Sequence, residues 1–209
     1  MPYLALALYA LFLLLAFGLR TMVHYRETGS SGLRLPPPGT PVVERLGGIL
    51  FVTALLLGIA APFLTLTGML ELVAALNRPF LLIVGQILYA AGLAITVWSQ
   101  ATMGRSWRIG VDPSERTALV TRGPFASVRN PIFSAMLLAT AGLVLLVPNA
   151  AALLSFVMLL AGVELQVRLV EEPYLMRTHG EAYGRYAASA GRFVPGVGRL
   201  GANSGSVSS

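Results

Sequence analysis

Cysteine is absent from this sequence and histidine is rare. Without cysteine the chain can form no disulfide and has no thiolate ligand for a metal. The two histidines, His24 and His179, are far apart in the sequence, so we expect no metal site. Charged residues make up only 11% of the 209 residues, while 56% are hydrophobic. Because soluble domains carry about 25% charged residues, we expect an integral membrane protein.

Lysine is also absent, so all fifteen basic residues are arginine. The net charge of +6 raises the question of nucleic-acid binding. In a membrane protein, however, arginines first report topology, because cytoplasmic loops collect positive charge. We therefore expect no nucleic-acid partner. The all-arginine basic set indicates a GC-rich bacterial genome, and thus a bacterial inner (plasma) membrane.

Five apolar segments are long enough to be membrane helices, which need about 20 residues each. They cover residues 2–19, 46–69, 79–100, 131–147 and 150–170. The first lacks a basic leader and a cleavage site, so we expect a retained helix rather than a signal peptide. Pro148 and Asn149 separate the last two segments, which predicts an antiparallel hairpin. We expect an all-α membrane protein with five transmembrane helices.

The distribution of the arginines predicts how these helices are oriented in the membrane. Fourteen of them lie in three segments: Arg20, Arg26, Arg34 and Arg45; Arg105, Arg108, Arg116, Arg122 and Arg129; and Arg168, Arg177, Arg185, Arg192 and Arg199. The opposite side has only Arg78. This asymmetry predicts that the three segments and the C-terminus are cytoplasmic and that the N-terminus is outside.

The polar stretches divide the chain into three parts. Residues 1–100 would hold the first three helices and a cytoplasmic Gly/Ser/Pro-rich loop at 27–41. Residues 101–195 would form the catalytic core, with the helical hairpin and a cytoplasmic amphipathic segment in which Leu175, Tyr183, Tyr186 and Phe193 lie along the membrane interface. Residues 196–209 are rich in glycine and serine, and we expect a disordered tail.

Charged residues cluster at the end of the last apolar segment. Glu164, Arg168 and the Glu171–Glu172 pair are three or four residues apart, so they share one face of a helix. One interpretation is an interfacial ladder of ion pairs; the other is a polar cavity at the edge of the bundle. Pro173 disfavours a helical conformation at Glu172, which predicts that the helix ends or kinks at the carboxylates.

The stretch GPFASVRNPIF, residues 123–133, precedes the fourth apolar segment. Asn130 and Pro131 are residue types that begin helices, and Arg129 fits a positive-inside position. A simple helix start is therefore one interpretation. It leaves unexplained the Gly123-Pro124-Phe125 turn and the Trp107-Arg108 pair upstream.

Three stretches resemble one known family. Residues 119–138, LVTRGPFASVRNPIFSAMLL, are similar to the pattern LVTxGPYxxVRHPxYxGxLL, which is found in the isoprenylcysteine carboxyl methyltransferase family and its phospholipid-methylating relatives. Residues 104–111, GRSWRIGV, are similar to the family's G-x-x-W segment. Residues 171–195 resemble EExxLxxxFGxEYxxYxxxVxRFxP. The resemblance covers about residues 100–197, with the motifs in the same order.

The resemblance implies S-adenosylmethionine as methyl donor, S-adenosylhomocysteine as product, no metal, and a lipophilic acceptor that enters from the bilayer. The cofactor-binding positions that it implies are Val120, Gly123, Pro124, Phe125, Arg129, Asn130, Pro131, Phe133, Glu171, Glu172, Tyr183 and Tyr186. We assign Arg129 and Arg168 as candidate catalytic residues that fix the acceptor's head group. Trp107 and Arg108 are candidate substrate-binding residues.

The sequence departs from the family pattern at several positions. Asn130 replaces a histidine and Ala135 a glycine, while Phe125 and Phe133 replace tyrosines. Asparagine still donates and accepts hydrogen bonds, but it cannot titrate as imidazole does. Methyl transfer from a sulfonium is an in-line displacement, in which the protein mainly aligns the reactants.

The leading hypothesis is thus an S-adenosylmethionine-dependent membrane methyltransferase (EC 2.1.1 class), whose acceptor is a carboxylate, amine or hydroxyl. Membrane reductases of the sterol reductase type, which use NADPH, have a similar C-terminal region and form an alternative. A second alternative is a non-catalytic membrane protein that retains the fold, for which the change at Asn130 is the main argument.

Overall fold

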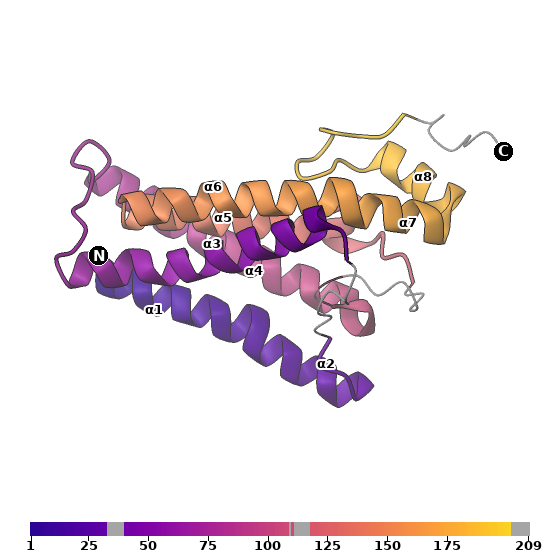
Figure 1. Ribbon diagram of the computed structural model, residues 1–209, viewed down its shortest axis with the longest axis horizontal. Helices are drawn as coiled ribbons and strands as arrows, with labels where there is room; N and C mark the ends of the chain where they lie inside the picture. The colour runs from indigo at the N-terminus through magenta and orange to yellow at the C-terminus, as the bar shows by residue number, and fades with distance from the viewer. Residues whose placement is uncertain (33–39, 109, 111–117, 202–209) are drawn as a thin grey trace.

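The computed structural model of the protein describes residues 1–32, 40–108, 110 and 118–201. Within these ranges every extended regular element is a helix, and strand-like pairing is limited to two isolated bridges. The helices form an elongated bundle with the N-terminus at one end and two short helices, α7 and α8, at the other (Figure 1). The predicted all-α class is confirmed.

Three continuous helical rods contain more than one element. The first is α1 (Pro2–Leu13), a π-helical turn (Leu14–Leu19) and α2 (Arg20–Thr28); the second is α4 (Pro79–Met103) with a 3-10 turn (Gly104–Ser106); the third is α6 (Ala150–Leu165), a π-helical turn (Gln166–Glu171) and α7 (Glu172–His179). The remaining elements are α3 (Val42–Leu66), a 3-10 turn (Gly123–Ala126), α5 (Pro131–Leu146) and α8 (Glu181–Ser189).

Apolar helices occur at all five predicted positions. Among the described residues, four are long and apolar enough to cross a membrane: Pro2–Thr28, Val42–Leu66, Pro79–Ser106 and Ala150–His179. The fifth, α5, has 16 residues and is about 24 Å long, which is less than the roughly 30 Å of a hydrocarbon core. The protein is therefore an integral membrane protein with a short apolar helix inside its bundle.

Two rods extend further than predicted. The first helix continues nine residues beyond Leu19, through α2, so the predicted loop at 27–41 begins only after Thr28; its residues 33–39 lie outside the described ranges. The last rod does not end at Pro173, and the predicted irregularity at this position is a π turn directly before it. Glu172 keeps helical angles, φ −61° and ψ −45°, and donates its backbone N–H to the Val167 carbonyl. The wider π turn accommodates the proline ring without breaking the helix.

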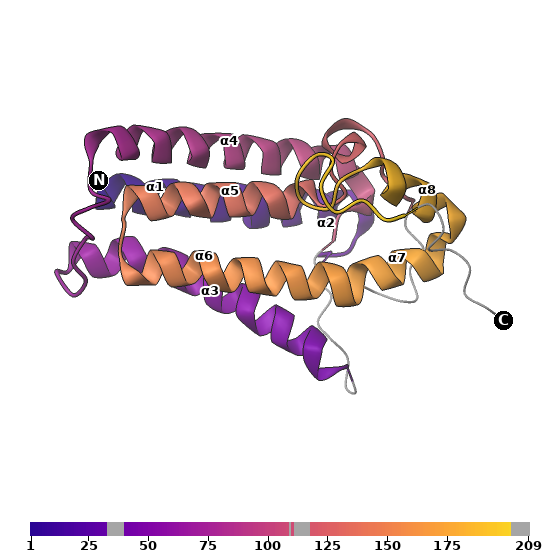
Figure 2. The same cartoon turned by 90° about the horizontal axis from the view of Figure 1, so that it is seen from above.

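Helices α4 and α5 lie side by side along most of their length (Figure 2). Their contact depends on glycines, which let the backbones approach closely. A β-carbon at Gly92 would lie 2.5 Å from the Ala139 nitrogen and 2.6 Å from the Ala135 carbonyl oxygen. One at Gly142 would lie 2.6 Å from the Gly85 carbonyl oxygen. The contact therefore has no room for a larger residue at either position.

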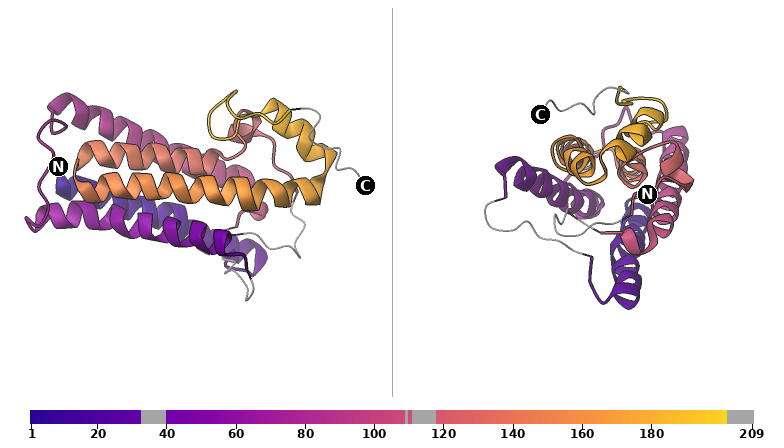
Figure 3. Two further views of the ribbon diagram at one scale, coloured as in Figure 1. Left: turned by 45° about the horizontal axis from the view of Figure 1, so that its top comes forward. Right: turned by 90° about the vertical axis from the view of Figure 1, so that its right-hand side faces the viewer.

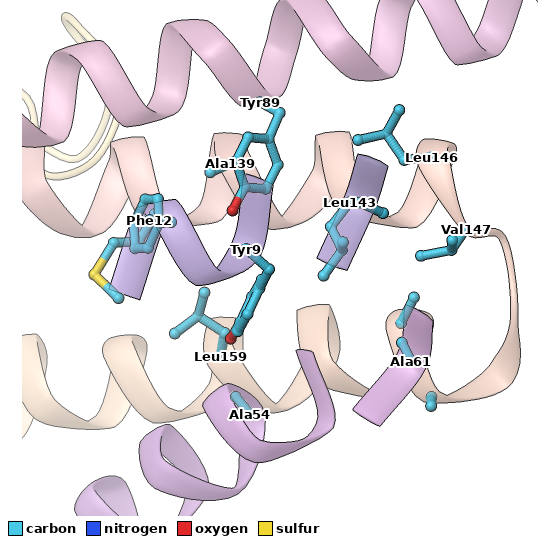
Figure 4. Packing of buried hydrophobic residues seen from close by; sticks show 14 of the residues in the cluster. Tyr9, Phe12, Ala54, Ala61, Tyr89, Ala139, Leu143, Leu146, Val147 and Leu159 are labelled. Atoms are coloured by element: carbon cyan, nitrogen blue, oxygen red, sulfur yellow. The ribbon is translucent and has the colours of Figure 1, made fainter. Parts of the chain in front are cut away.

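Helices α3 and α6 form the second close pair (Figure 2). The Ser155 hydroxyl on α6 donates to the Ala54 carbonyl at 2.8 Å. Two tyrosine hydroxyls connect the pairs through α1: Tyr9 donates to the Leu55 carbonyl at 2.9 Å, and Tyr89 donates to the Leu8 carbonyl at 3.1 Å. Both rings lie in the buried cluster between the helices (Figure 4). Helix α1 thus joins α3 to α4.

The α5–α6 hairpin turns at Asn149, as predicted. The Asn149 side chain accepts a hydrogen bond from the Ala152 backbone nitrogen at 2.9 Å, which caps α6. Its amide also donates to the Ala61 carbonyl at 2.9 Å and to the Thr65 hydroxyl at 2.8 Å. One buried side chain therefore caps α6 and attaches the hairpin to the end of α3.

Replacing Gly92 by alanine should weaken the α4–α5 contact. Overpacking of this kind costs about 1–3 kcal/mol, so we expect a lower midpoint of thermal unfolding in detergent. Gly48→Ala is the matched control, because a β-carbon there meets nothing within 4 Å. Equal midpoints for the two variants would contradict the proposed role of Gly92.

Candidate functional site

The polar candidates gather at the end of the bundle that carries α7 and α8. There the 3-10 turn Gly123–Ala126 and the start of α5 meet the last rod and the segment after α8 (Figures 1 and 3). These segments are far apart in the sequence. What joins them is a network of buried charges and backbone hydrogen bonds.

Glu172 is the centre of this network. Its carboxylate Oε1 accepts from the Arg129 Nη2 at 2.6 Å and from the Arg192 Nε at 2.9 Å, while Oε2 accepts from the Arg192 Nη2 at 2.8 Å. The carboxylate lies on α7, Arg129 just before α5, and Arg192 after α8. One buried carboxylate thus holds three segments together. The positive charges of the two arginines offset the free-energy cost of burying the negative charge of Glu172.

The Arg129 guanidinium is enclosed, with only 1% of its side chain exposed. Besides Glu172, it donates to the carbonyls of Ala187 at 3.1 Å, Ala190 at 2.5 Å and Gly198 at 3.0 Å. Its Nε is buried without a hydrogen-bond partner. The terminal nitrogens are therefore occupied by the protein, and Nε is the donor that remains for another group.

Backbone pairing brings the segment after α8 against the start of α5. Val128 and Gly191 form a parallel bridge, in which the Arg129 nitrogen donates to the Gly191 carbonyl at 2.8 Å. The Asn130 nitrogen donates to the Arg192 carbonyl at 3.1 Å, and its side-chain amide donates to the same oxygen at 3.2 Å. Asn130 thus precedes α5 as predicted, but its side chain bonds the tail rather than capping the helix.

The aromatic residues of α8 pack inward. Tyr183 is 1% exposed, and its ring lies edge-on to that of Tyr186. The Tyr186 hydroxyl donates to the Phe125 carbonyl at 2.7 Å. Burial, reinforced by the Glu172 charge, raises the pKa of Tyr183 to about 12. The Tyr183 ring thus packs against the protein, while the half-buried Tyr186 ring bonds the loop before α5.

The segment after α8 is bonded beyond residue 195. The Arg192 nitrogen donates to the Val197 carbonyl at 2.8 Å, and the Leu200 nitrogen to the Ala187 carbonyl at 3.0 Å. The Gly/Ser-rich composition predicts disorder from residue 196, but residues 197, 198 and 200 are hydrogen-bonded to the site. Residues 202–209 of that predicted tail lie outside the described part of the chain.

Glu171 and Glu172 are directed to different partners, although they are adjacent. Glu171 is the last residue of the π turn. Its carboxylate accepts from the Gln166 amide at 3.5 Å, which is a long contact for a hydrogen bond. Glu172 is fully engaged by the arginines, whereas Glu171 retains acceptor capacity. Isolated π turns in long helices are frequent at functional sites.

Trp107 and Arg108 lie near this end of the bundle, but they contact different elements. The Arg108 guanidinium lies 5.6 Å from the centre of the Tyr174 ring, and its Nη2 is 3.3 Å from the Tyr174 hydroxyl. Trp107 is 3% exposed and packs against His24 of α2. Of the matching stretch 104–111, residues 109 and 111 lie outside the described ranges.

Other predicted residues are not brought into the network. Arg168 pairs with Glu164 one helical turn away, and 53% of its side chain is exposed. Phe133 packs on Phe51 of α3 within the bundle, with 6.3 Å between ring centres. Val120 is half-buried before the 3-10 turn, and Pro131 is buried at the start of α5. Of the predicted ladder of ion pairs along this helix, the described residues form only the pair between Glu164 and Arg168.

Sequence reasoning missed Arg192 as a partner of Glu172. The signal was available in the matched pattern, where an arginine precedes the Phe-x-Pro of the tail. The distribution of arginines along the sequence indicates only a cytoplasmic position for Arg192. Its pairing depends on the fold-back of α8, which local patterns do not reveal.

Comparison with known proteins supports a methyltransferase domain. The family model described as phospholipid methyltransferase matches residues 80–182, from the start of α4 into α8. No curated protein matches the chain. The matched residues include the 3-10 turn, Arg129, Glu171 and Glu172, while Arg192 lies beyond them.

Glu172→Gln should release the segment after α7. Removing one partner of a buried pair costs about 3–5 kcal/mol, because the other charge stays uncompensated. Limited trypsin digestion should then cut after Arg185 and Arg192 much faster than in the parent protein. Glu181→Gln is the matched control, since its ion pair with Arg185 is largely exposed. Equal digestion rates for both variants would show that Glu172 does not hold the tail.

Proposed function

Because residues 80–182 belong to the phospholipid methyltransferase family, we propose that the protein is an S-adenosylmethionine-dependent methyltransferase of the EC 2.1.1 class. Its acceptor is a lipophilic or membrane-embedded molecule. The observation that carries this proposal is the Glu172 network. It joins the loop before α5 and the end of the last rod, which are the two stretches in which the cofactor motifs occur.

The groups at this end of the bundle suit the proposed cofactor. Glu171 has acceptor capacity for ribose hydroxyls, since its hydrogen bond to the Gln166 amide is long. The Arg129 Nε is a buried donor without a partner, and guanidinium groups bind carboxylates well. Phe125 and Tyr186 supply aromatic surface, and aromatic faces attract cations such as a sulfonium. When bound, the cofactor would supply an electrophilic methyl group.

Five remaining residues of the proposed site lie in or beside the loop before α5: Val120, Gly123, Pro124, Asn130 and Pro131. The other three are Phe133, which packs on Phe51 inside the bundle, and Glu172 and Tyr183. Gly123 has a φ of +60°, which favours glycine, and lets the turn pass close to Thr102. We assign Glu172 and Tyr183 a positioning role, since both are buried in internal contacts.

Arg129 acts as a positioning residue rather than by direct contact with the acceptor. Its terminal nitrogens are occupied by four protein acceptors. It therefore fixes the loop before α5 against the tail, and alignment of reactants is the main requirement of methyl transfer. Arg168 is exposed beside Glu164, where it is open to a head group at the membrane surface.

The catalytic unit would correspond to residues 101–195, with residues 1–100 supplying the other membrane helices. The arginine distribution supports a cytoplasmic site and an external N-terminus in a bacterial inner membrane. The acceptor would approach from the bilayer on the side of Trp107 and Arg108.

Asn130 does not argue against catalysis. Its amide donates to the Arg192 carbonyl, a structural role that a neutral histidine can also fill. This favours an active enzyme over a non-catalytic protein that retains the fold. A reductase of the sterol reductase type remains the alternative enzyme class for the test below.

Calorimetry of the detergent-purified protein separates these functions. We expect S-adenosylhomocysteine to bind and NADPH to give no heat of binding. Binding of NADPH alone would overturn the proposal in favour of a reductase, and binding of neither would favour a non-catalytic protein.

Glu171→Gln should weaken the binding of S-adenosylhomocysteine by about 10-fold, because the amide replaces one acceptor oxygen by a donor and leaves a ribose hydroxyl without its partner. Glu164→Gln, the same change on the same rod, should leave the affinity unchanged. Equal affinities for the two variants would exclude Glu171 from the cofactor site. Calorimetry gives both values directly.

A further inference from the structure

The first rod carries a buried arginine outside the network just described. Arg20 is the first residue of α2, directly after the π turn, and only 8% of it is exposed. It follows an apolar stretch that begins at Pro2, so it lies where a membrane helix leaves the hydrocarbon. Basic pockets between membrane helices at this depth bind lipid head groups.

The contacts of Arg20 do not neutralise its charge. Its Nη2 donates to the Gly104 carbonyl, and its Cζ lies 5.1 Å from the centre of the Trp107 ring. Its Nε is buried without a hydrogen-bond partner. Within the described ranges no ion pair includes Arg20. The one acidic residue of its own helix, Glu27, lies seven positions further on. Its charge acts on Arg20 through space, but the two side chains form no ion pair.

The contacts of Arg20 offset only part of the free-energy cost of burying its charge. Burying a charged group costs several kcal/mol even after relaxation. A cation–π contact returns about 0.5–2 kcal/mol, and a hydrogen bond to a neutral carbonyl about 1 kcal/mol. Arg129, by contrast, has a carboxylate partner. A bound phosphate or carboxylate would supply a negatively charged partner and an acceptor for Nε.

Arg20 is close to the proposed cofactor loop. It bonds Gly104, the residue directly after α4, and Thr102 lies two residues earlier. A β-carbon at Gly123 would lie 3.2 Å from the Thr102 side chain. The same end of α4 therefore contacts Arg20 and the turn that begins at Gly123.

We propose that Arg20 binds the anionic head group, a phosphate or a carboxylate, of a bilayer amphiphile, and that this amphiphile is the methyl acceptor. The anion site stands on the contacts of Arg20. The identification of its ligand as the acceptor rests on the proposed function. The Trp107 ring against Arg20 would report binding.

Tryptophan fluorescence tests the site. Trp98 is 58% exposed on the outside of α4, so Trp98→Phe leaves Trp107 as the single tryptophan of the protein. This protein, in maltoside micelles, would be titrated with dodecyl phosphate, dodecanoate, dodecanol and inorganic phosphate. We expect saturable emission changes with the two anionic amphiphiles and none with dodecanol.

Variants assign the effect to Arg20. Arg20→Gln should weaken the binding of dodecyl phosphate by about 10-fold or more, whereas Arg26→Gln, an equal charge change on the same helix, should not. Arg20→Lys, which keeps the charge and loses the planar fork, should lie between them. Equal affinities for the Arg20 and Arg26 variants, or saturation by dodecanol, would overturn the site. Inorganic phosphate that binds as tightly as dodecyl phosphate would overturn the amphiphile as its ligand.

Calorimetry with S-adenosylhomocysteine distinguishes a failure of the anion site from a failure of the proposed methyltransferase function. If Arg20→Gln binds S-adenosylhomocysteine as the parent does, the variant is folded and its loss of dodecyl phosphate binding is local. If the parent protein does not bind S-adenosylhomocysteine, the methyltransferase proposal fails, and the titrations still decide the anion site. The comparison of dodecyl phosphate with dodecanol needs no variant.

Discussion

The buried carboxylate of Glu172, held between Arg129 and Arg192, is the interaction on which this end of the protein depends. It joins the start of α5, the last helical rod and the segment after α8. Each arginine alone would be a costly buried charge, and so would the carboxylate. Because the three charges stabilise one another, the loop before α5 is fixed in a single position. A site built on that loop is therefore preorganised, which is what methyl transfer requires of a protein.

Membrane packing brings the three segments to the same end. Glycines at Gly92 and Gly142 let α4 and α5 approach closely, and the capped turn at Asn149 returns the chain along α5. The rod that follows continues to His179 because its π turn accommodates Pro173. It therefore carries Glu171 and Glu172 to the loop before α5. The side chains of the apolar bundle contribute no charge to the site. The close packing of its helices, however, determines where the charged residues meet.

More of the fold than of the candidate site could be predicted from the sequence. The lengths of the apolar segments predict where the membrane helices lie, because a helix needs about 20 apolar residues to cross the bilayer. Their ends were less predictable: α2 is too polar to be read as part of a span, yet it continues the first rod. The motifs located Arg129 and Glu172, but not the bond between them. Arg192 and the inward packing of Tyr183 depend on the fold-back of α8, and Arg20 depends on contacts with Gly104 and Trp107. These are tertiary contacts without a local pattern.

The account is tested most directly by an experimental structure of the protein with S-adenosylhomocysteine. We expect the ligand between Glu171, Phe125 and the segment after α8, with both arginines still bound to Glu172. A ligand located elsewhere, or one whose binding separates Glu172 from Arg129 and Arg192, would contradict the central claim that this network builds the site.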